Sequence, residues 1–192
     1  MSPLRQIDAK NKIEHKKNFP GDVVIIKGEW KKGVTLFDVS DELEEGDIII
    51  KGANAINLDT KQAGVLIGIQ TGGTIITTIQ NVVGKRVRLI IPVGLEKRVS
   101  CDLRKTSLMI NSPGNKGLRL IPVEGEVITE IEAVSILTGS IAELFAAGGV
   151  CGAQGSIWLS VRGNREEIRK IEEIYSSILL EPPFGENIKI SI

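Results

Sequence analysis

An alternation of apolar runs and glycine turns over residues 34–97 constrains the fold of this chain most strongly. The runs are rich in β-branched residues, which favour strands, and one of them instead has the apolar spacing of a helical face. The predicted elements are strands at 23–28, 33–39 and 46–52, a further strand before the Gly-Gly turn, a helix whose apolar face runs over 75–83 and a strand at 87–93. Strands and helices in this order are typical of α/β folds, which build ligand sites at the turns that follow strands.

The second half begins after a turn at 113–117, which has the sequence PGNKG. Thr129 and Glu132 have the spacing of a capping box and predict a helix that continues to about Ala147. Asn164 is the expected cap of a later helix with an isoleucine-rich face, which Pro182 and Pro183 stop. Strands are predicted at 117–123, 156–163 and 187–192.

These elements predict an α/β protein in two parts that follow a charged N-terminal arm. Residues 1–20 carry several lysines and no apolar periodicity, which indicates a flexible basic arm. Residues 21–116 are expected to form a Rossmann-like ligand-binding half with a mixed or parallel sheet. Residues 117–192 are expected to form a βαβαβ unit, which is compatible with a parallel or mixed sheet or with a ferredoxin-like sandwich.

Composition excludes several classes of protein. The 192 residues are 42% hydrophobic, which is enough for one large or two small cores. The 24 Lys and Arg residues balance 24 Asp and Glu residues, and only seven residues are Phe, Trp or Tyr, so nucleic-acid binding is not expected. No signal-peptide core and no run of about 18 apolar residues is present, which favours a cytoplasmic protein without membrane contact.

A candidate anion site lies where the Gly-Gly turn meets the predicted helix. Glycines 72 and 73 leave the first helical amides open, and Thr71 or Thr74 is the expected cap. Gly52 and Asn54 end a neighbouring strand and complete the site, with Lys97 as a source of positive charge. The alternative is that Gly-Gly only makes a tight turn, because the full phosphate-loop pattern is absent.

The order Gly-Ala-Asn at 52–54, Gly-Gly-Thr at 72–74 before a helix, and Pro-Val at 92–93 resembles the isomerase and CoA-transferase-like superfamily. That superfamily includes methylthioribose-phosphate isomerase, the translation initiation factor 2B subunits, ribose-phosphate isomerase and the sugar-phosphate-sensing domains of DeoR-type repressors. The resemblance covers about residues 34–97, a third of the chain. No DNA-binding helix-turn-helix is evident before residue 34, so the resemblance implies no repressor.

The resemblance implies that Asn54 occupies the place of a catalytic acid and that Gly72, Gly73 and Thr74 form the phosphate side of a phosphosugar site. Asparagine cannot exchange a proton near neutral pH, so the isomerase reaction lacks its acid–base group here. Asp59 could replace that group only if its loop folds back. The resemblance therefore implies a binding fold more than that reaction.

Other chemistry has weaker candidates. Cys151 lies among glycines and could be a nucleophile, but the sole histidine, His15, is in the charged arm. Glu96, with Lys97 beside it, is an alternative acid or base. Free thiols are expected at Cys101 and Cys151, and the scarcity of His and Cys predicts neither a metal site nor a cofactor.

Binding of a small anionic metabolite, phosphorylated or carboxylated, is therefore the function that the sequence predicts. An enzyme of the isomerase or transferase type with a non-standard acid or base is a second possibility. The third is a non-catalytic regulatory module that forms a homo-oligomer, for example through the isoleucine-rich strand at 187–192.

Overall fold

The computed structural model describes residues 21–181, which fall into two compact units. The first contains residues 21–39 and the second contains Ser40–Leu180. The predicted basic arm at 1–20 and the predicted strand at 187–192 lie outside the described residues. None of the helices between residues 21 and 181 has the length and apolar character needed to span a membrane.

Two strand predictions in the first unit were wrong. A short hairpin, β1 (Ile25–Ile26) and β2 (Glu29–Trp30), replaces the single strand expected at 23–28. The chain turns back because Lys27 and Gly28 both adopt positive φ, at 52° and 83°. The strand expected at 33–39 is instead a short helix, α1 (Leu36–Val39), in which the Asp38 carboxylate accepts hydrogen bonds from the Thr35 amide and hydroxyl.

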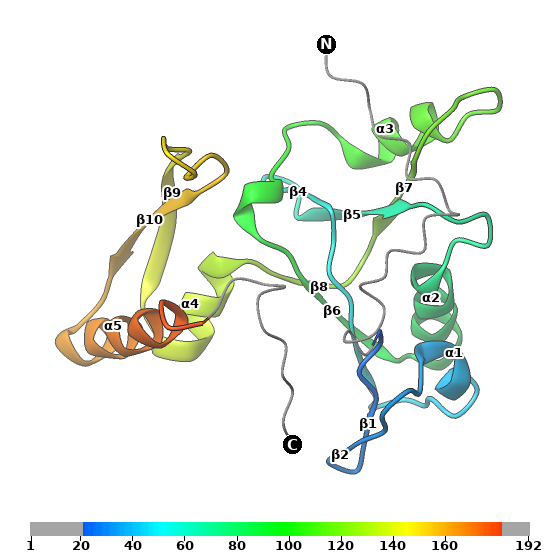
Figure 1. Cartoon of the computed structure of the whole chain (residues 1–192), viewed down its shortest axis with the longest axis horizontal. Coiled ribbons are helices and arrows are strands. Elements are labelled where there is room, and N and C mark those ends of the chain that lie inside the picture. The colour runs from blue at the N-terminus through cyan, green and yellow to red at the C-terminus, as the bar shows by residue number, and fades with distance from the viewer. Residues whose placement is uncertain (1–20, 182–192) are drawn as a thin grey trace. The chain divides into compact units, whose positions relative to one another are not determined.

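A three-stranded parallel sheet organises the second unit (Figure 1). It consists of β3 (Ile48–Ile50), β6 (Arg88–Pro92) and β8 (Glu126–Ile128), with β6 in the centre. Its buried side chains include Ile49, Leu89 and Ile91, which confirms the apolar run at 87–93 as a strand. The predicted helix is also confirmed as α2 (Thr74–Lys85), which contacts β6.

An antiparallel sheet accompanies the parallel one in the same unit. It consists of β4 (Ala55–Asn57), β5 (Gln62–Ile67) and β7 (Arg119–Val123), and the helix α3 (Leu103–Ile110) packs on β5 and β7. Ile56, Val65, Leu103 and Leu120 are buried there. Each sheet therefore combines strands from before and after the turn at 113–117.

The remaining α-helices and strands form two helices and a hairpin. They are α4 (Glu130–Thr138), β9 (Ile141–Ala147), β10 (Ile157–Arg162) and α5 (Arg165–Ile178). The helix predicted to reach Ala147 was wrong in its second half, because Gly139, at a φ of 83°, ends α4 and β9 then pairs with β10. The described part of the second half therefore reads ββαββα, not βαβαβ.

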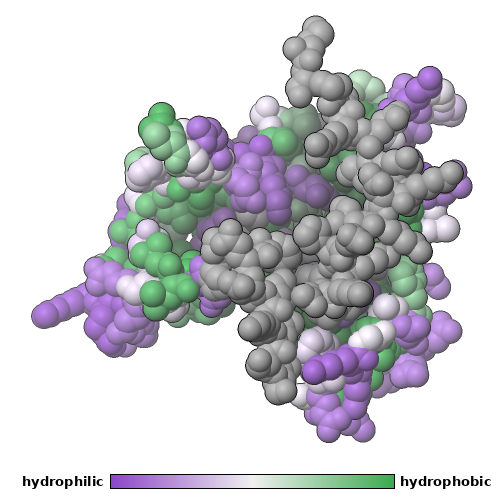
Figure 2. Space-filling model, in the orientation of Figure 1, coloured by the Kyte–Doolittle hydropathy of each residue, from purple (hydrophilic) through white to green (hydrophobic). Residues whose placement is uncertain are grey.

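Both helices in this region begin as predicted. Thr129 with Glu132, and Asn164 with Glu167, each form a complete capping box. Large apolar side chains nevertheless remain exposed, including Leu137, Phe145 and Trp158, and hydrophobic colour appears over this region in Figure 2. The two sheets thus contain most of the buried core, while α4, β9, β10 and α5 contribute few buried side chains.

Candidate functional site

The carboxyl edge of the parallel sheet is the place where such folds present ligand-binding groups. The backbone is tightly joined there: the Lys51 amide donates to the Ile90 carbonyl at 3.0 Å, and the Val93 amide donates to the Ile128 carbonyl at 2.9 Å. The segments that leave β3, β6 and β8 therefore start from fixed positions.

The 3-10 turn η2 (Leu95–Lys97) follows β6 at this edge. Leu95 is fully buried, and its amide donates to Oε2 of Glu130, in the first turn of α4, at 2.9 Å. Nη1 of Arg98 donates to the Leu95 carbonyl at 3.1 Å, and the next amide, that of Val99, donates to the Ile56 carbonyl at 2.8 Å. Hydrogen bonds to β4, to α4 and between residues of the turn itself therefore fix its position.

A pocket of about 390 Å³ opens beside this turn, within the range of about 300–1,000 Å³ typical of small-molecule sites. Its lining residues come from the η2 turn and its C-cap, from the last residue of β9 and from the loop between β9 and β10. They are Glu96, Arg98, Ala147, Gly148, Gly155 and Ser156. The pocket thus combines an acid, a guanidinium, a hydroxyl and glycine backbone.

The hairpin side of the pocket is ordered by hydrogen bonds around Gly148. The Gly148 carbonyl accepts from the Ser156 hydroxyl and from Nε1 of Trp158, each at 2.9 Å, and the Gly148 amide donates to the Ser156 carbonyl at 2.8 Å. Gly148 and Gly155 both have positive φ, which favours glycine, so no side chain projects into the pocket from either position.

The two charged lining residues differ in their partners. Nζ of Lys97 lies 3.7 Å from Oε1 of Glu96, a long ion pair between partly exposed side chains. Arg98 is exposed, and among residues 21–181 it has no carboxylate within ion-pair distance and its guanidinium donates only to the Leu95 carbonyl. Within the described part of the chain, Arg98 therefore has donor groups left for a ligand.

The Gly-Gly turn has a different cap from the one predicted. Gly73 itself is the N-cap of α2, with no side-chain hydrogen bond to the first turn, so neither Thr71 nor Thr74 caps the helix. Isoleucine side chains lie over the turn: a Cβ added to Gly72 would be 2.1 Å from Cγ1 of Ile76. The first-turn amides thus receive no side-chain cap, the Ile76 amide donates to the Gly73 carbonyl at 3.2 Å, and apolar groups lie next to the turn.

Three other predicted site residues, Asn54, Asp59 and Gly52, do not line the pocket. Oδ1 of Asn54 accepts from the Leu66 amide at 3.0 Å, which joins Asn54 to the end of β5. Asp59 is exposed in the turn between β4 and β5. Gly52 passes close to Pro92, whose carbonyl oxygen would be 3.8 Å from an added Cβ.

Cys151 is exposed in the β9–β10 loop with a φ of 56° and does not line the pocket. Among the predicted site residues, Glu96 alone lines it, with Lys97 as its neighbour. Sequence reasoning missed Arg98 and Ser156. Arg98 could have been found from its place just after β6, whereas Ser156 could not, because β9 had been predicted as helix.

Searches of protein-family models, curated proteins and solved structures find no match for this chain. The resemblance to the isomerase and CoA-transferase-like superfamily therefore stays a prediction. Within residues 21–181 no three His, Cys, Asp or Glu side chains lie close enough together to hold a metal ion.

Proposed function

We propose that this protein binds a small anionic metabolite in the pocket beside the η2 turn. The observation that carries this proposal is the position of Arg98, which lines the pocket and has no carboxylate partner among the described residues. A guanidinium can donate two parallel hydrogen bonds to a carboxylate or phosphate, and such charge-assisted bonds are about twice as strong as neutral ones. We therefore expect the ligand to carry a carboxylate or a phosphate that accepts hydrogen bonds from Arg98.

The surroundings of Arg98 support this role. Its backbone is held on both sides, because the Arg98 amide donates to the Leu95 carbonyl at 3.2 Å and the Val99 amide donates to Ile56. Because this backbone is already fixed, less conformational entropy is lost when a ligand binds. The hydroxyl of Ser156, which donates to Gly148, keeps its oxygen lone pairs for a donor group of the ligand.

The Gly-Gly turn is a second position for the same kind of ligand. The uncapped amides of α2 favour an anion, and the Rossmann-like arrangement implied by the superfamily resemblance would place a phosphosugar near Gly72, Gly73, Thr74 and Asn54. The apolar side chains of Ile69 and Ile76, which lie over the glycines, weigh against this position.

A thermal-shift screen with phosphosugars, nucleotides, CoA esters and small carboxylates tests the proposal. A ligand at 100 times its Kd should stabilise the protein by about 2.7 kcal/mol. Arg98→Gln should abolish the shift if the pocket binds the ligand, whereas Thr74→Asp should abolish it if the α2 turn does. Arg162→Gln is the matched control, because this exposed arginine pairs with Glu143 on the hairpin. A screen in which no phosphate-bearing or carboxylate-bearing compound stabilises the protein contradicts the proposal.

An acid–base enzyme is the second candidate, because Glu96 is a titratable group in the pocket lining. Once a ligand is known, Glu96→Gln should abolish turnover of that ligand and leave its affinity unchanged. Equal loss of turnover and affinity would reject the acid–base role.

A further inference from the structure

Glu96 and Arg98 bring opposite charges to the same pocket from positions two residues apart. We propose that the ligand is a zwitterion of the α-amino acid class, with its carboxylate on Arg98 and its ammonium on Glu96. This inference rests on the proposed function, since it specifies the ligand of the same site.

The charge of the lining argues against a doubly charged anion. Glu96 and Arg98 together contribute no net charge, so a phosphate dianion would face the carboxylate of Glu96 while only one guanidinium neutralises it. Like charges a few ångströms apart repel each other, and the repulsion grows as a ligand displaces water. A zwitterion avoids this repulsion because each of its charges meets the opposite one.

The carboxylate of Glu96 has a weak partner that a ligand ammonium can replace. Its existing partner, Lys97, is 3.7 Å away, and the two side chains are 44% and 40% exposed. Exposed ion pairs of this kind are weak, so a ligand ammonium can compete with Lys97. Lys97 is also not one of the residues that line the pocket.

Gly94 leaves room for that carboxylate. Oε2 of Glu96 lies where a Cβ on residue 94 would be, so the carboxylate folds back over this glycine. Any side chain at position 94 would displace it. The position of the Glu96 carboxylate therefore depends on the absence of a side chain at residue 94.

The test compares ligands that differ only in the amino group. Calorimetric titrations of the full chain would use L-alanine with propionate, L-glutamate with glutarate, and L-phenylalanine with 3-phenylpropionate, after a thermal-shift screen of all twenty L-amino acids. We expect one amino acid to bind at least tenfold more tightly than its deaminated analogue. Inorganic phosphate and a phosphosugar serve as dianion probes and should bind more weakly than this amino acid.

Substitutions then test whether the ligand ammonium binds to Glu96. Glu96→Gln should weaken binding of the amino acid at least tenfold and leave the affinity for the analogue unchanged or higher. Glu143→Gln, an exposed acid paired with Arg162, should alter neither affinity. Because the ligand pairs are compared in the unsubstituted protein as well, the test does not depend on the folding of a variant.

The outcomes separate the two proposals. If carboxylates or phosphates bind through Arg98 as tightly as amino acids and Glu96→Gln changes nothing, the zwitterion inference is overturned and the anion-binding function stands. If no carboxylate, phosphate or amino acid binds, the proposed function itself is rejected. Binding of an amino acid that Arg98→Gln does not weaken would also overturn the inference.

Discussion

Glu130 accepts a hydrogen bond from the buried amide of Leu95, so that the first turn of α4 fixes the turn that carries Glu96 and Arg98. Removing this acceptor with Glu130→Ala should lower the free energy of unfolding by about 1–3 kcal/mol, because a buried N–H then has no partner. Urea denaturation measures this loss. Glu124→Ala is the control: Glu124 is 81% exposed and paired with Arg104, so its loss should cost less than about 1 kcal/mol. Equal effects of the two substitutions would contradict the assigned role.

The two glycines of α2 should respond oppositely to alanine. Gly73 has a φ of 65° and a ψ of −159°, a region open almost only to glycine, so Gly73→Ala should destabilise the protein by about 1–3 kcal/mol. Gly84 lies inside the helix, and nothing lies within 4 Å of an added Cβ. Gly84→Ala should therefore stabilise by about 0.5–1 kcal/mol. Thermal unfolding of both variants decides the point, and a stabilising Gly73→Ala would show that the described turn geometry is wrong.

Glu132 should contribute a pH-dependent part of the stability. Burial alone would raise its pKa, but hydrogen bonds from Lys61 and Thr129 lower the pKa from 4.5 to about 2. A lowered folded-state pKa stabilises the protein above pH 4.5, and this contribution is lost as the pH falls from 4.5 towards 2. Glu132→Gln should remove on the order of 1–2 kcal/mol at pH 7 and flatten this part of the pH–stability curve. An unchanged curve would argue against the Lys61–Glu132 pair.

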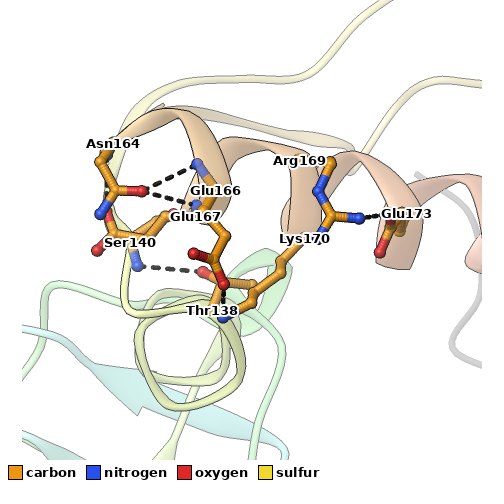
Figure 3. A network of polar contacts seen from close by, with 8 residues as sticks. All are labelled: Thr138, Ser140, Asn164, Glu166, Glu167, Arg169, Lys170 and Glu173. Carbon is orange, nitrogen blue, oxygen red and sulfur yellow. Dashed lines mark hydrogen bonds and ion pairs between the residues drawn. The ribbon is translucent and has the colours of Figure 1, made fainter.

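Thr138 and Ser140, drawn in Figure 3, should differ in their tolerance of alanine. Both are buried, but Oγ1 of Thr138 donates to the Val134 carbonyl and accepts from the Ser140 amide, whereas Oγ of Ser140 has no partner among the described residues. Thr138→Ala should therefore cost about 1–3 kcal/mol. Ser140→Ala should be neutral or stabilising, because it removes a buried hydroxyl that makes no hydrogen bond. Chemical denaturation of the pair tests both expectations, and a large loss for Ser140→Ala would reveal a missing partner of its hydroxyl.

The elements predicted correctly are those in which local chemistry and packing agree. Asn164 and Thr129 start their helices because their side chains bond first-turn amides, an effect contained within a few residues. The run at 87–93 is a strand because its apolar residues are buried in a sheet. In contrast, the run at 141–147 has apolar residues that suit a helix as well as a strand, and only its pairing with β10 decides between them.

The candidate site was predictable only in part for the same reason. Glu96 and Arg98 follow a strand that the sequence reveals, so their general position at its carboxyl end could be inferred. The hairpin loop that completes the pocket comes from elsewhere in the chain, and its approach to Glu96 depends on tertiary packing. The N-cap of α2 was also predicted wrongly. Gly73 occupies the N-cap position that was expected of Thr71 or Thr74, and its backbone angles could not be inferred from the sequence.

The interleaving of strands in both sheets has a consequence for synthesis of the chain. β6 pairs with β3 and β8, and β5 pairs with β7, so neither sheet is complete until residues beyond 118 have been made. A ribosome that has released only the first hundred residues exposes a chain whose strands β5 and β6 still have open edges. Contacts between strands so far apart in sequence form slowly, and open edges favour aggregation meanwhile. We therefore expect chains truncated near residue 116 to depend on chaperones, whereas chains that extend past α4 can close both sheets.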